Sequence, residues 1–356
     1  MSDGTGTAAF DYPLPPDRIA QEPAARREAA RLMVLDRSAP DAAPVDATFA
    51  AIGSFLRPGD LLVLNDSRVF PARLPARKPS GGRVDLLLLK PEPEDPSGAT
   101  WRALASSGRG LRAGLRLSVA PGFEAEFLGE AEGGRVRVRL LAETGPVAEA
   151  IERHGVMPLP PYIRREPDDA RAPLDRVRYQ TAFARETGSI AAPTAGLHFT
   201  PELIEALERS GVVITRLTLH VGPGTFQPVR AARIEDHRLE PEWYRLPEEA
   251  AAAIAACRAH GGRVAAVGTT VTRVLESRAE DGGGVRPGSG LCDLYITPGH
   301  RFRVVDLLIT NFHLPKSSLL VLVSAFAGRD RILAAYREAI ARGYRFYSYG
   351  DAMLIR

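Results

Sequence analysis

Residues 178–202, RYQTAFARETGSIAAPTAGLHFTPE, lie between a proline-rich segment and the part of the chain in which helices and strands alternate. Thr200, Pro201 and Glu202 combine a hydroxyl cap, a proline at the first helical position and an acid in the first turn, which predicts a helix beginning at Pro201. Residues 193–199 then precede a helix N-terminus, where free backbone N–H groups favour anionic or polar ligands. The same glycine and proline residues also fit a tight turn that binds nothing.

Beyond this stretch, predicted helices and strands alternate along the chain. Leu203, Ile204 and Leu207 recur at helical spacing, and residues 212–221 alternate as a strand does. This alternation is typical of an α/β domain. Further helices are predicted at 247–260, from 268–270 through 275, at 318–327 and at 330–342, with strands at 263–267, 291–296 and 302–309; upstream, strands are predicted at 31–36 and 61–64 and a helix at 46–56.

Residues 72–142 have a different pattern. Turn signals such as Gly133-Gly134 separate short strands, and no helical pattern interrupts them, which predicts a small antiparallel barrel or sandwich. In the last strand Arg135, Arg137 and Arg139 alternate with apolar residues, so one face is basic; this face either meets phosphates or is simply solvated. The strands are predicted at 83–89, 100–105, 115–119, 124–128 and 135–141.

The composition is that of a globular protein. Of the 356 residues, 45% are hydrophobic and 25% charged, and the formal net charge of +3 does not by itself indicate a nucleic-acid partner. Cys257 and Cys292 form no CxxC pair, which argues against a disulfide scaffold or a cysteine zinc site. The polar N-terminus is unlike a signal peptide, and the longest apolar run, 319–327, is too short to cross a bilayer. We therefore expect a cytoplasmic protein without a membrane partner.

Four polar loops follow apolar strand ends, and each is rich in glycine, hydroxyl, histidine or asparagine side chains. In an open α/β sheet such loops share the edge at which ligands bind, so together with residues 193–198 they predict one composite site. No histidine pair has metal-ligand spacing, and no GxSxG, GxGxxG or GxxxxGK[ST] motif occurs, so a metal site, a hydrolase triad, a dinucleotide fold and a nucleoside triphosphatase lack support. The loops are 65–68, 220–225, 268–270 and 310–318.

Eight segments, in order along nearly the whole chain, resemble one family, the S-adenosylmethionine:tRNA ribosyltransferase-isomerases of queuosine synthesis. The segments are LVLNDSRVFPARL (62–74), PLPPYI (158–163), RYQT (178–181), GSIAAPTAGLHFT (188–200), HVGPGTFQPV (220–229), VGTTVTRVLES (267–277), VVDLLITNFHLPKSSLLVLVSAFAG (304–328) and YRFYSYGDAMLI (344–355). The resemblance implies a discontinuous three-layer α/β domain, 1–70 with 155–356, and an inserted small antiparallel β-barrel domain at 71–154.

The same resemblance implies the reaction. S-adenosylmethionine, a substrate rather than a cofactor, donates its ribosyl part to a 7-aminomethyl-7-deazaguanine at the wobble position of tRNA, giving epoxyqueuosine, adenine and methionine. The sulfonium acidifies the C5′ hydrogens, so a positioned base can remove one, and a proton donor assists the departure of adenine. No metal or further cofactor is implied. The partner is tRNA, whose wobble base is exposed in the anticodon stem-loop, and we expect the protein to be a monomer.

Within this interpretation, His198, His220 and His313, in that order, are the candidates for proton transfer, and no single role is assigned to any of them. His198→Ala is expected to lower turnover severely and to leave the thermal midpoint nearly unchanged. Basic candidates would clamp a carboxylate or a phosphate. The candidates for binding either substrate are Asn65, Asp66, Ser67, Arg68, Tyr179, Gln180, Thr194, Gly196, Thr225, Thr269, Thr270, Arg273, Asn311, Lys316, Ser317 and Asp351.

Two segments depart from the family pattern. Where the family usually reads His-Lys-Met-His-Ser-Glu, residues 237–242 read HRLEPE, so we assign this segment no catalytic role and leave Glu240 out of the site. Residues 105–108, ASSG, stand where a Lys-Pro pair is common. Two alternatives stay open: an RNA-binding module that has lost turnover, motivated by the altered segment, and an S-adenosylmethionine methyltransferase, whose glycine-rich strand–loop–helix is not evident.

Overall fold

The computed structural model describes residues 6–39, 41–106, 110–166, 169–226 and 229–356, without the side chains of residues 225 and 226. In this part of the chain the largest sheet has nine strands. Their order is β15 (Gly288–Cys292), β13 (Glu242–Leu246), β12 (Val213–Leu219), β3 (Leu61–Asn65), β14 (Val264–Val267), β16 (Leu307–Asn311), β17 (Ala352–Ile355), β1 (Arg31–Leu35) and β2 (Val45–Thr48). The adjacent strands β12, β3, β14 and β16 run parallel, so their carboxyl ends meet at one edge.

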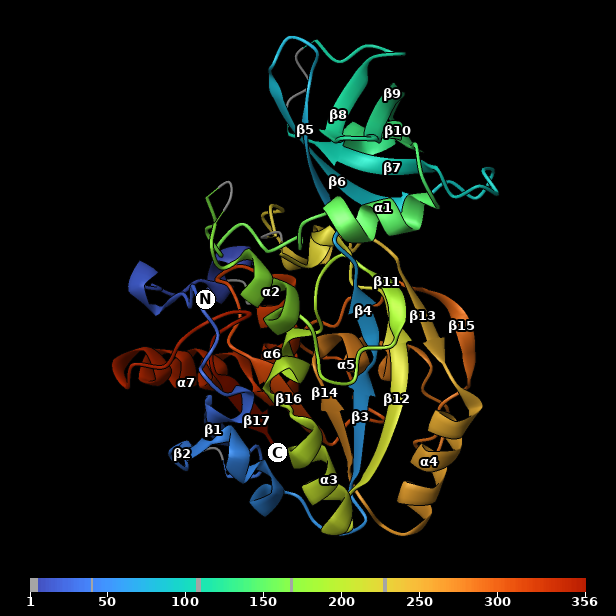
Figure 1. Cartoon of the computed structure of the whole chain (residues 1–356). Helices are drawn as coiled ribbons and strands as arrows, with labels where there is room; N and C mark the ends of the chain where they lie inside the picture. Colours follow the sequence, from blue (N-terminus) through green and yellow to red (C-terminus); the bar gives the residue numbers. More distant parts are fainter. Residues whose placement is uncertain (1–5, 40, 107–109, 167–168, 227–228) are drawn as a thin grey trace.

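The sheet is buried on both faces, because successive side chains of a strand point to opposite sides. In β3, Leu61 and Val63 belong to one core, and Leu62 and Leu64 to another. The first face packs against α4 (Glu248–Ala259), α5 (Thr269–Ser277), α6 (Ser318–Ala327) and α7 (Arg329–Ala341); the second packs against α3 (Pro201–Arg209) and the 3-10 helices η4 (Phe49–Phe55) and η6 (Thr194–His198). The predicted three-layer α/β arrangement is confirmed (Figure 1).

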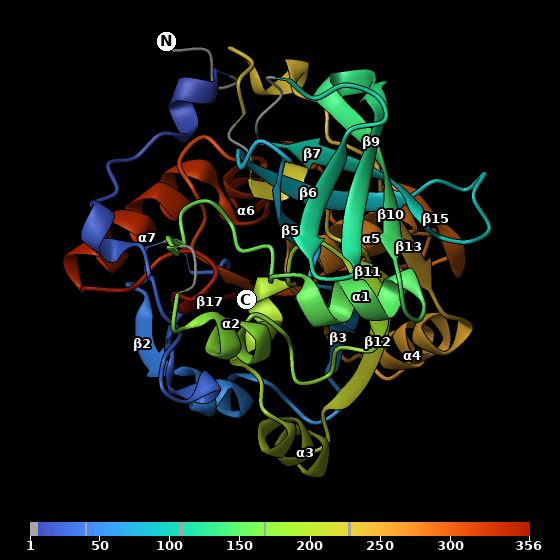
Figure 2. The same ribbon diagram turned by 45° about the horizontal axis from the view of Figure 1, so that its top comes forward.

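A closed antiparallel barrel is inserted into this domain between β4 (Ser67–Val69) and α1 (Val147–His154). Its strands are β5 (Arg73–Arg77), β6 (Arg83–Pro91), β7 (Thr100–Ala105), β8 (Arg116–Ala120), β9 (Phe123–Ala131) and β10 (Arg135–Ala142), in the order β10-β7-β6-β5-β8-β9. Figure 1 shows the barrel standing at one end of the α/β domain, with α1 at its base, and in Figure 2, where this end comes forward, the barrel lies in front of that domain. The sequence left barrel and sandwich open, and the structure has the barrel; the domain limits 71–154 stay a prediction.

Some elements differ from the prediction for local reasons. Residues 46–56, predicted as a helix, form the end of β2 and η4, because the edge strand β2 pairs with β1 and Gly53 disfavours an α-helix. The strand predicted at 291–296 lies earlier, at Gly288–Cys292, where it pairs with β13. The strand predicted at 302–309 begins only at Leu307. The prediction missed β5, whose Pro75 disguises a strand.

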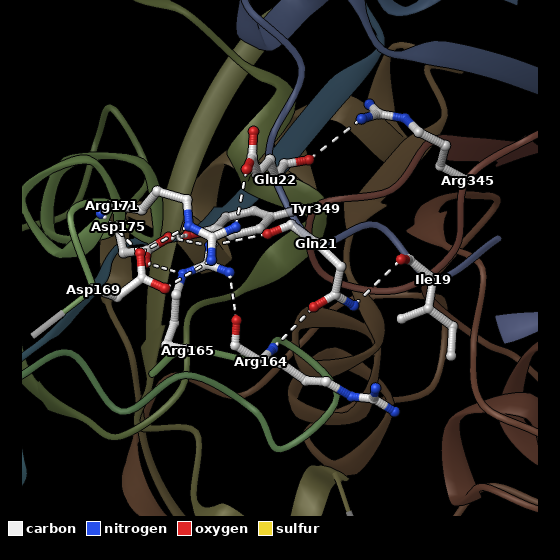
Figure 3. A network of polar contacts seen from close by, with 10 residues as sticks. All are labelled: Ile19, Gln21, Glu22, Arg164, Arg165, Asp169, Arg171, Asp175, Arg345 and Tyr349. Atoms are coloured by element: carbon white, nitrogen blue, oxygen red, sulfur yellow. Dashed lines mark hydrogen bonds and ion pairs between the residues drawn. The ribbon is translucent and has the colours of Figure 1, made fainter. Parts of the chain in front are cut away.

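Figure 3 shows a polar network that ties the linker returning from the barrel to the α/β domain. Arg165 and Asp175, the latter in α2 (Ala172–Arg178), form a buried ion pair with two bonds, Nε–Oδ2 at 2.6 Å and Nη2–Oδ1 at 2.9 Å. Tyr349 donates its hydroxyl to Asp175 at 2.9 Å, and Arg165 also donates to the carbonyl of Gln21 at 2.9 Å. Three segments that are distant in sequence therefore meet at one buried guanidinium. Removing its carboxylate partner would cost about 3–5 kcal/mol.

Candidate active site

A cavity of about 1060 Å³ lies between the barrel and the carboxyl edge of the sheet. Its volume exceeds the range of roughly 300–1,000 Å³ that is typical of sites for one small ligand. The walls come from the barrel, from α1 and from the loops around β12, β13 and β15. Among the lining residues are Lys90, Trp101, Arg102, Arg135, Glu152, Gly188, His220, Gly222, Glu240, Glu242, Trp243, Arg273 and Leu291.

His220 lies directly after β12, and its imidazole lines the cavity. Its backbone N–H donates to the carbonyl of Trp243 at 2.9 Å, and its ring stacks on the Trp243 ring with centroids 4.9 Å apart. On another side the ring lies against Gly188, where an added Cβ would be 2.6 Å from Nε2. Burial lowers the pKa of His220 below its ordinary value, so the imidazole is neutral at pH 7 and able to accept a proton.

A buried ion pair lies beside His220 in the cavity wall. Arg273 of α5 and Glu242 of β13 are 4% and 7% exposed, and the guanidinium Nη2 contacts the carboxylate Oε2. The other carboxylate oxygen accepts the backbone N–H of Gly222 at 2.7 Å. Burial alone would lower the pKa of Arg273, but the Glu242 carboxylate outweighs it and the pKa is raised. Glu242 thus fixes a charged guanidinium next to the loop that follows His220.

The barrel contributes a cationic wall of Lys90, Arg102 and Arg135. Arg102 pairs with Glu92 at 3.0 Å. Arg135 Nη2 reaches across to Glu240 Oε1 of the α/β domain at 2.6 Å, and these side chains are 29% and 57% exposed. An exposed pair of this kind contributes only about 0–1 kcal/mol, so a phosphate could replace the carboxylate at little cost.

His198 and His313, the other two histidine candidates, are not among the described residues that line the cavity. His198 packs against the Phe49 ring at 5.0 Å, and its Nε2 lies 3.3 Å from Asn311 Nδ2. His313 Nε2 lies 2.7 Å from Thr310 Oγ1. Burial lowers the pKa of each to about 3, so both rings are neutral and weakly basic. Their role in proton transfer stays a prediction.

The burial of His198 revises the expected effect of His198→Ala on stability. The side chain is 4% exposed, so its removal leaves a cavity and should lower the free energy of unfolding by about 2–4 kcal/mol. The thermal midpoint should therefore fall by several degrees, whatever happens to turnover. Calorimetry tests this directly, with His260→Ala at the exposed end of α4 as the control. An unchanged midpoint for His198→Ala would contradict the expected loss.

Several binding candidates at the strand ends bond to the protein itself. Asn65 exchanges hydrogen bonds with the backbone of Leu219, donating at 3.0 Å and accepting at 3.0 Å. Asp66 accepts the hydroxyl of Thr218 at 2.7 Å, and burial raises its pKa. Ser67 lies 3.3 Å from Ser189, whose Oγ accepts the N–H of Val221 at 2.8 Å. These contacts hold β3, β4 and β12 together behind the loop that carries His220.

The remaining candidates, apart from Arg273, lie at several places in the fold. Gln180 bonds the N–H and the carbonyl of Val69, Ser317 caps α6, Asp351 accepts the N–H groups of Arg31 and Arg345, and Asn311 donates to the carbonyl of Tyr347. Arg68 pairs with Glu152 at 3.1 Å, Lys316 pairs with Asp11 at 2.7 Å, and Tyr179 packs against Tyr349. Gly196 packs against Phe183, Thr194 begins η6, and Thr269 and Thr270 begin α5. The side chain of Thr225 lies outside the described residues.

A family model described as queuosine biosynthesis protein matches residues 7–355. The chain belongs to this family. Proteins named S-adenosylmethionine:tRNA ribosyltransferase-isomerase from Trichlorobacter lovleyi and Aquifex aeolicus are each 50% identical to it, over 346 and 349 residues, covering 97% of this chain and 98% of each relative. The crystal structure of an S-adenosylmethionine tRNA ribosyltransferase from Thermotoga maritima is 38% identical, with a TM-score of 0.55, and the match covers 98% of this chain and all of that one. The resemblance seen in the sequence is confirmed.

The altered family segment, residues 237–242, lines the cavity of this member of the queuosine biosynthesis family. The sequence predicts no catalytic role for it, because its second histidine and its serine are replaced. Glu242, which keeps the glutamate of the family pattern, could have been found from that identity, since it holds Arg273 and Gly222. Trp243, Lys90 and Arg102 lie in no motif, and of the cationic barrel wall only Arg135 belongs to the basic strand face seen in the sequence. Only the packing of the barrel against the sheet brings them to His220.

Among the described residues, no three or more His, Cys, Asp or Glu side chains are placed to hold a metal ion. In the same ranges, every helix is too short or too polar to span a bilayer.

Proposed function

We propose that this chain transfers and isomerises the ribosyl moiety of S-adenosylmethionine onto 7-aminomethyl-7-deazaguanine at the wobble position of tRNA, giving epoxyqueuosine, adenine and methionine. The names of the relatives support this activity. The cavity of about 1060 Å³ is the observation that supports a location for this activity, because it has a neutral histidine on the sheet side and cations on the barrel side. The histidine can remove a proton from the sulfonium substrate, and the cations can bind the phosphates of a tRNA nucleotide.

Of the three histidine candidates, His220 is the one that lines the cavity, so we assign it the proton transfer at C5′. The sulfonium stabilises the carbanion that forms when the neutral imidazole removes the C5′ proton. The imidazolium then holds this proton beside the departing groups, where it is available to adenine. The aminomethyl nitrogen, as its neutral amine, forms the new C–N bond to the ribosyl part and loses a proton, while the bonds from the ribosyl part to adenine and to the methionine sulfur break. Gly188 and Trp243 keep the ring in place for these steps.

The charged groups around His220 bind rather than react. Arg273 can orient the carboxylate of the methionine part, and Glu242 favours the nearby positive sulfonium. On the opposite wall, Lys90, Arg102 and Arg135 can bind the phosphates of the anticodon loop. In this arrangement the barrel positions the RNA while the sheet edge carries out the chemistry. The remaining candidates stabilise the structure around the site, or bind substrate at places outside this cavity.

The test is to incubate the protein with S-adenosylmethionine and an anticodon stem-loop that carries the aminomethyl-deazaguanine. Release of adenine and methionine, with epoxyqueuosine in the RNA, is the expected result. S-adenosylhomocysteine would indicate a methyltransferase instead, and RNA binding without any product would indicate a binding module. We also expect turnover to persist in a metal chelator, with the protein eluting as a monomer in size-exclusion chromatography.

A further inference from the structure

Three side chains form a row across neighbouring strands at the cavity wall. His220 follows β12, Trp243 lies beside it on β13, and Leu291 is the direct partner of Trp243 on β15. All three line the cavity. Trp243 is 39% exposed and Leu291 is 67% exposed. On either side of Trp243 in β13, Glu242 and Tyr244 are buried. The row therefore presents an apolar surface that the protein's own core does not cover.

The barrel wall of Lys90, Arg102 and Arg135 lines the same cavity from the barrel side, across from this surface. Glu92 and Glu240 partly neutralise the charge of that wall. An apolar aromatic surface opposite cations is the arrangement that binds single-stranded nucleic acid, because a base packs on the ring while its phosphate meets the charges. The base must be unpaired, since a base within a duplex has no free face.

The distance from His220 indicates which base would lie there. Neighbouring strands are about 4.8 Å apart, so Trp243 and Leu291 lie roughly 5 and 10 Å from His220 along the row. The atoms that react must lie next to His220 itself. The far end of the row then receives a neighbouring nucleotide, and the cavity has room for more than one ligand.

We propose that Trp243 and Leu291 form the surface on which an unpaired nucleobase adjacent to the reacting base packs, while the barrel cations hold its phosphate. This inference rests on the proposed function, which supplies the RNA substrate. It assigns part of the recognition of the anticodon loop to two residues, neither of which itself transfers a proton.

The test is a double-mutant cycle between protein and RNA. Wild type and Trp243→Ala are each assayed with the stem-loop and with stem-loops that lack the base immediately 5′ or immediately 3′ of the reacting one. If that base packs on Trp243, the protein change and one of the two RNA changes each raise KM for RNA by roughly ten-fold, and together they raise it no further. KM for S-adenosylmethionine stays unchanged.

Trp243→Ala also removes the ring beside His220, so its kcat falls as well. The cycle cancels this effect because it compares different RNAs in the same protein. Leu291→Ala leaves the His220–Trp243 contact in place and should raise KM for the intact stem-loop in the same direction. Val213→Ala is the control, because Val213 is 48% exposed at the start of β12 and lies outside the cavity lining; it should change nothing.

The outcomes separate this inference from the proposed function. Additive effects with both RNAs, in a wild type that releases adenine, would overturn the packing surface and leave the proposed function standing. A wild type that releases no adenine contradicts the proposed function. In that case the same cycle is read from Kd by fluorescence anisotropy of labelled stem-loops, where non-additive effects support the surface and additive effects reject it.

Discussion

His220→Ala is expected to lower kcat/KM by about 100-fold or more, the usual contribution of a positioned general base. The side chain lies at the cavity wall after the end of β12, so its removal takes away the proton acceptor and leaves the sheet core in place. Adenine release measures the rate, and RNA binding should be retained. His260→Ala, which changes an exposed histidine at the end of α4, is the matched control. A rate for His220→Ala close to that of wild type would remove His220 from the mechanism.

The pH dependence of the wild-type rate gives a second measurement of the same residue. Burial lowers the pKa of His220, Glu186 raises it in part and Arg245 lowers it further. The base form therefore predominates above the ordinary histidine pKa of about 6.5. We expect kcat/KM to be level near neutrality and to fall only at pH values below about 6.5. An acid limb centred above that value would contradict the assignment.

Gly188→Ala is expected to lower kcat nearly as much as the loss of His220 itself. An added Cβ would lie 2.6 Å from His220 Nε2, and the ring cannot retreat without leaving its stack on Trp243. The methyl group therefore displaces the base from its position. Gly290→Ala, in β15 of the large sheet, is the control, because its Cβ would make only ordinary contacts, at 3.5 Å from Tyr244.

The double variant Gly188→Ala/His220→Ala distinguishes displacement of the ring from a general loss of structure. If Gly188 acts only through the imidazole, the double variant turns over no more slowly than His220→Ala alone. A further large loss in the double variant, or an unchanged kcat for Gly188→Ala, would show that the space at Gly188 serves another purpose.

The sequence predicted the elements whose signals are local. The strand at β3, the capped helix α3 and the barrel strand β7 lie where the spacing placed them. The helix predicted at residues 46–56 was wrong. The first of these residues belong to the edge strand β2, which pairs with β1, and the spacing of apolar residues does not show this pairing; a 3-10 helix follows. The resemblance supplied the insertion of one domain into another, which no single periodic pattern indicates.

The site was harder to predict because its histidines look alike in sequence. His220 and His313 lie in polar loops that follow strand ends, and His198 lies in the polar segment before α3. Phe49, which covers His198, is about 150 positions away, and Tyr336 bonds the backbone of His313 from α7. Trp243 and Arg135 reach the cavity from different domains. Which imidazole meets a ligand is decided by these long-range contacts and not by the loop around it.

The two walls of the cavity belong to separately packed cores, one inside the barrel and one beside the sheet. The exposed Arg135–Glu240 pair is a direct bridge between them across the cavity. Under the proposed function, an RNA that touches both walls would link the two cores a second time. An RNA too short to reach the barrel cations would lose their phosphate contacts and should bind more weakly, even when its modified base is correct.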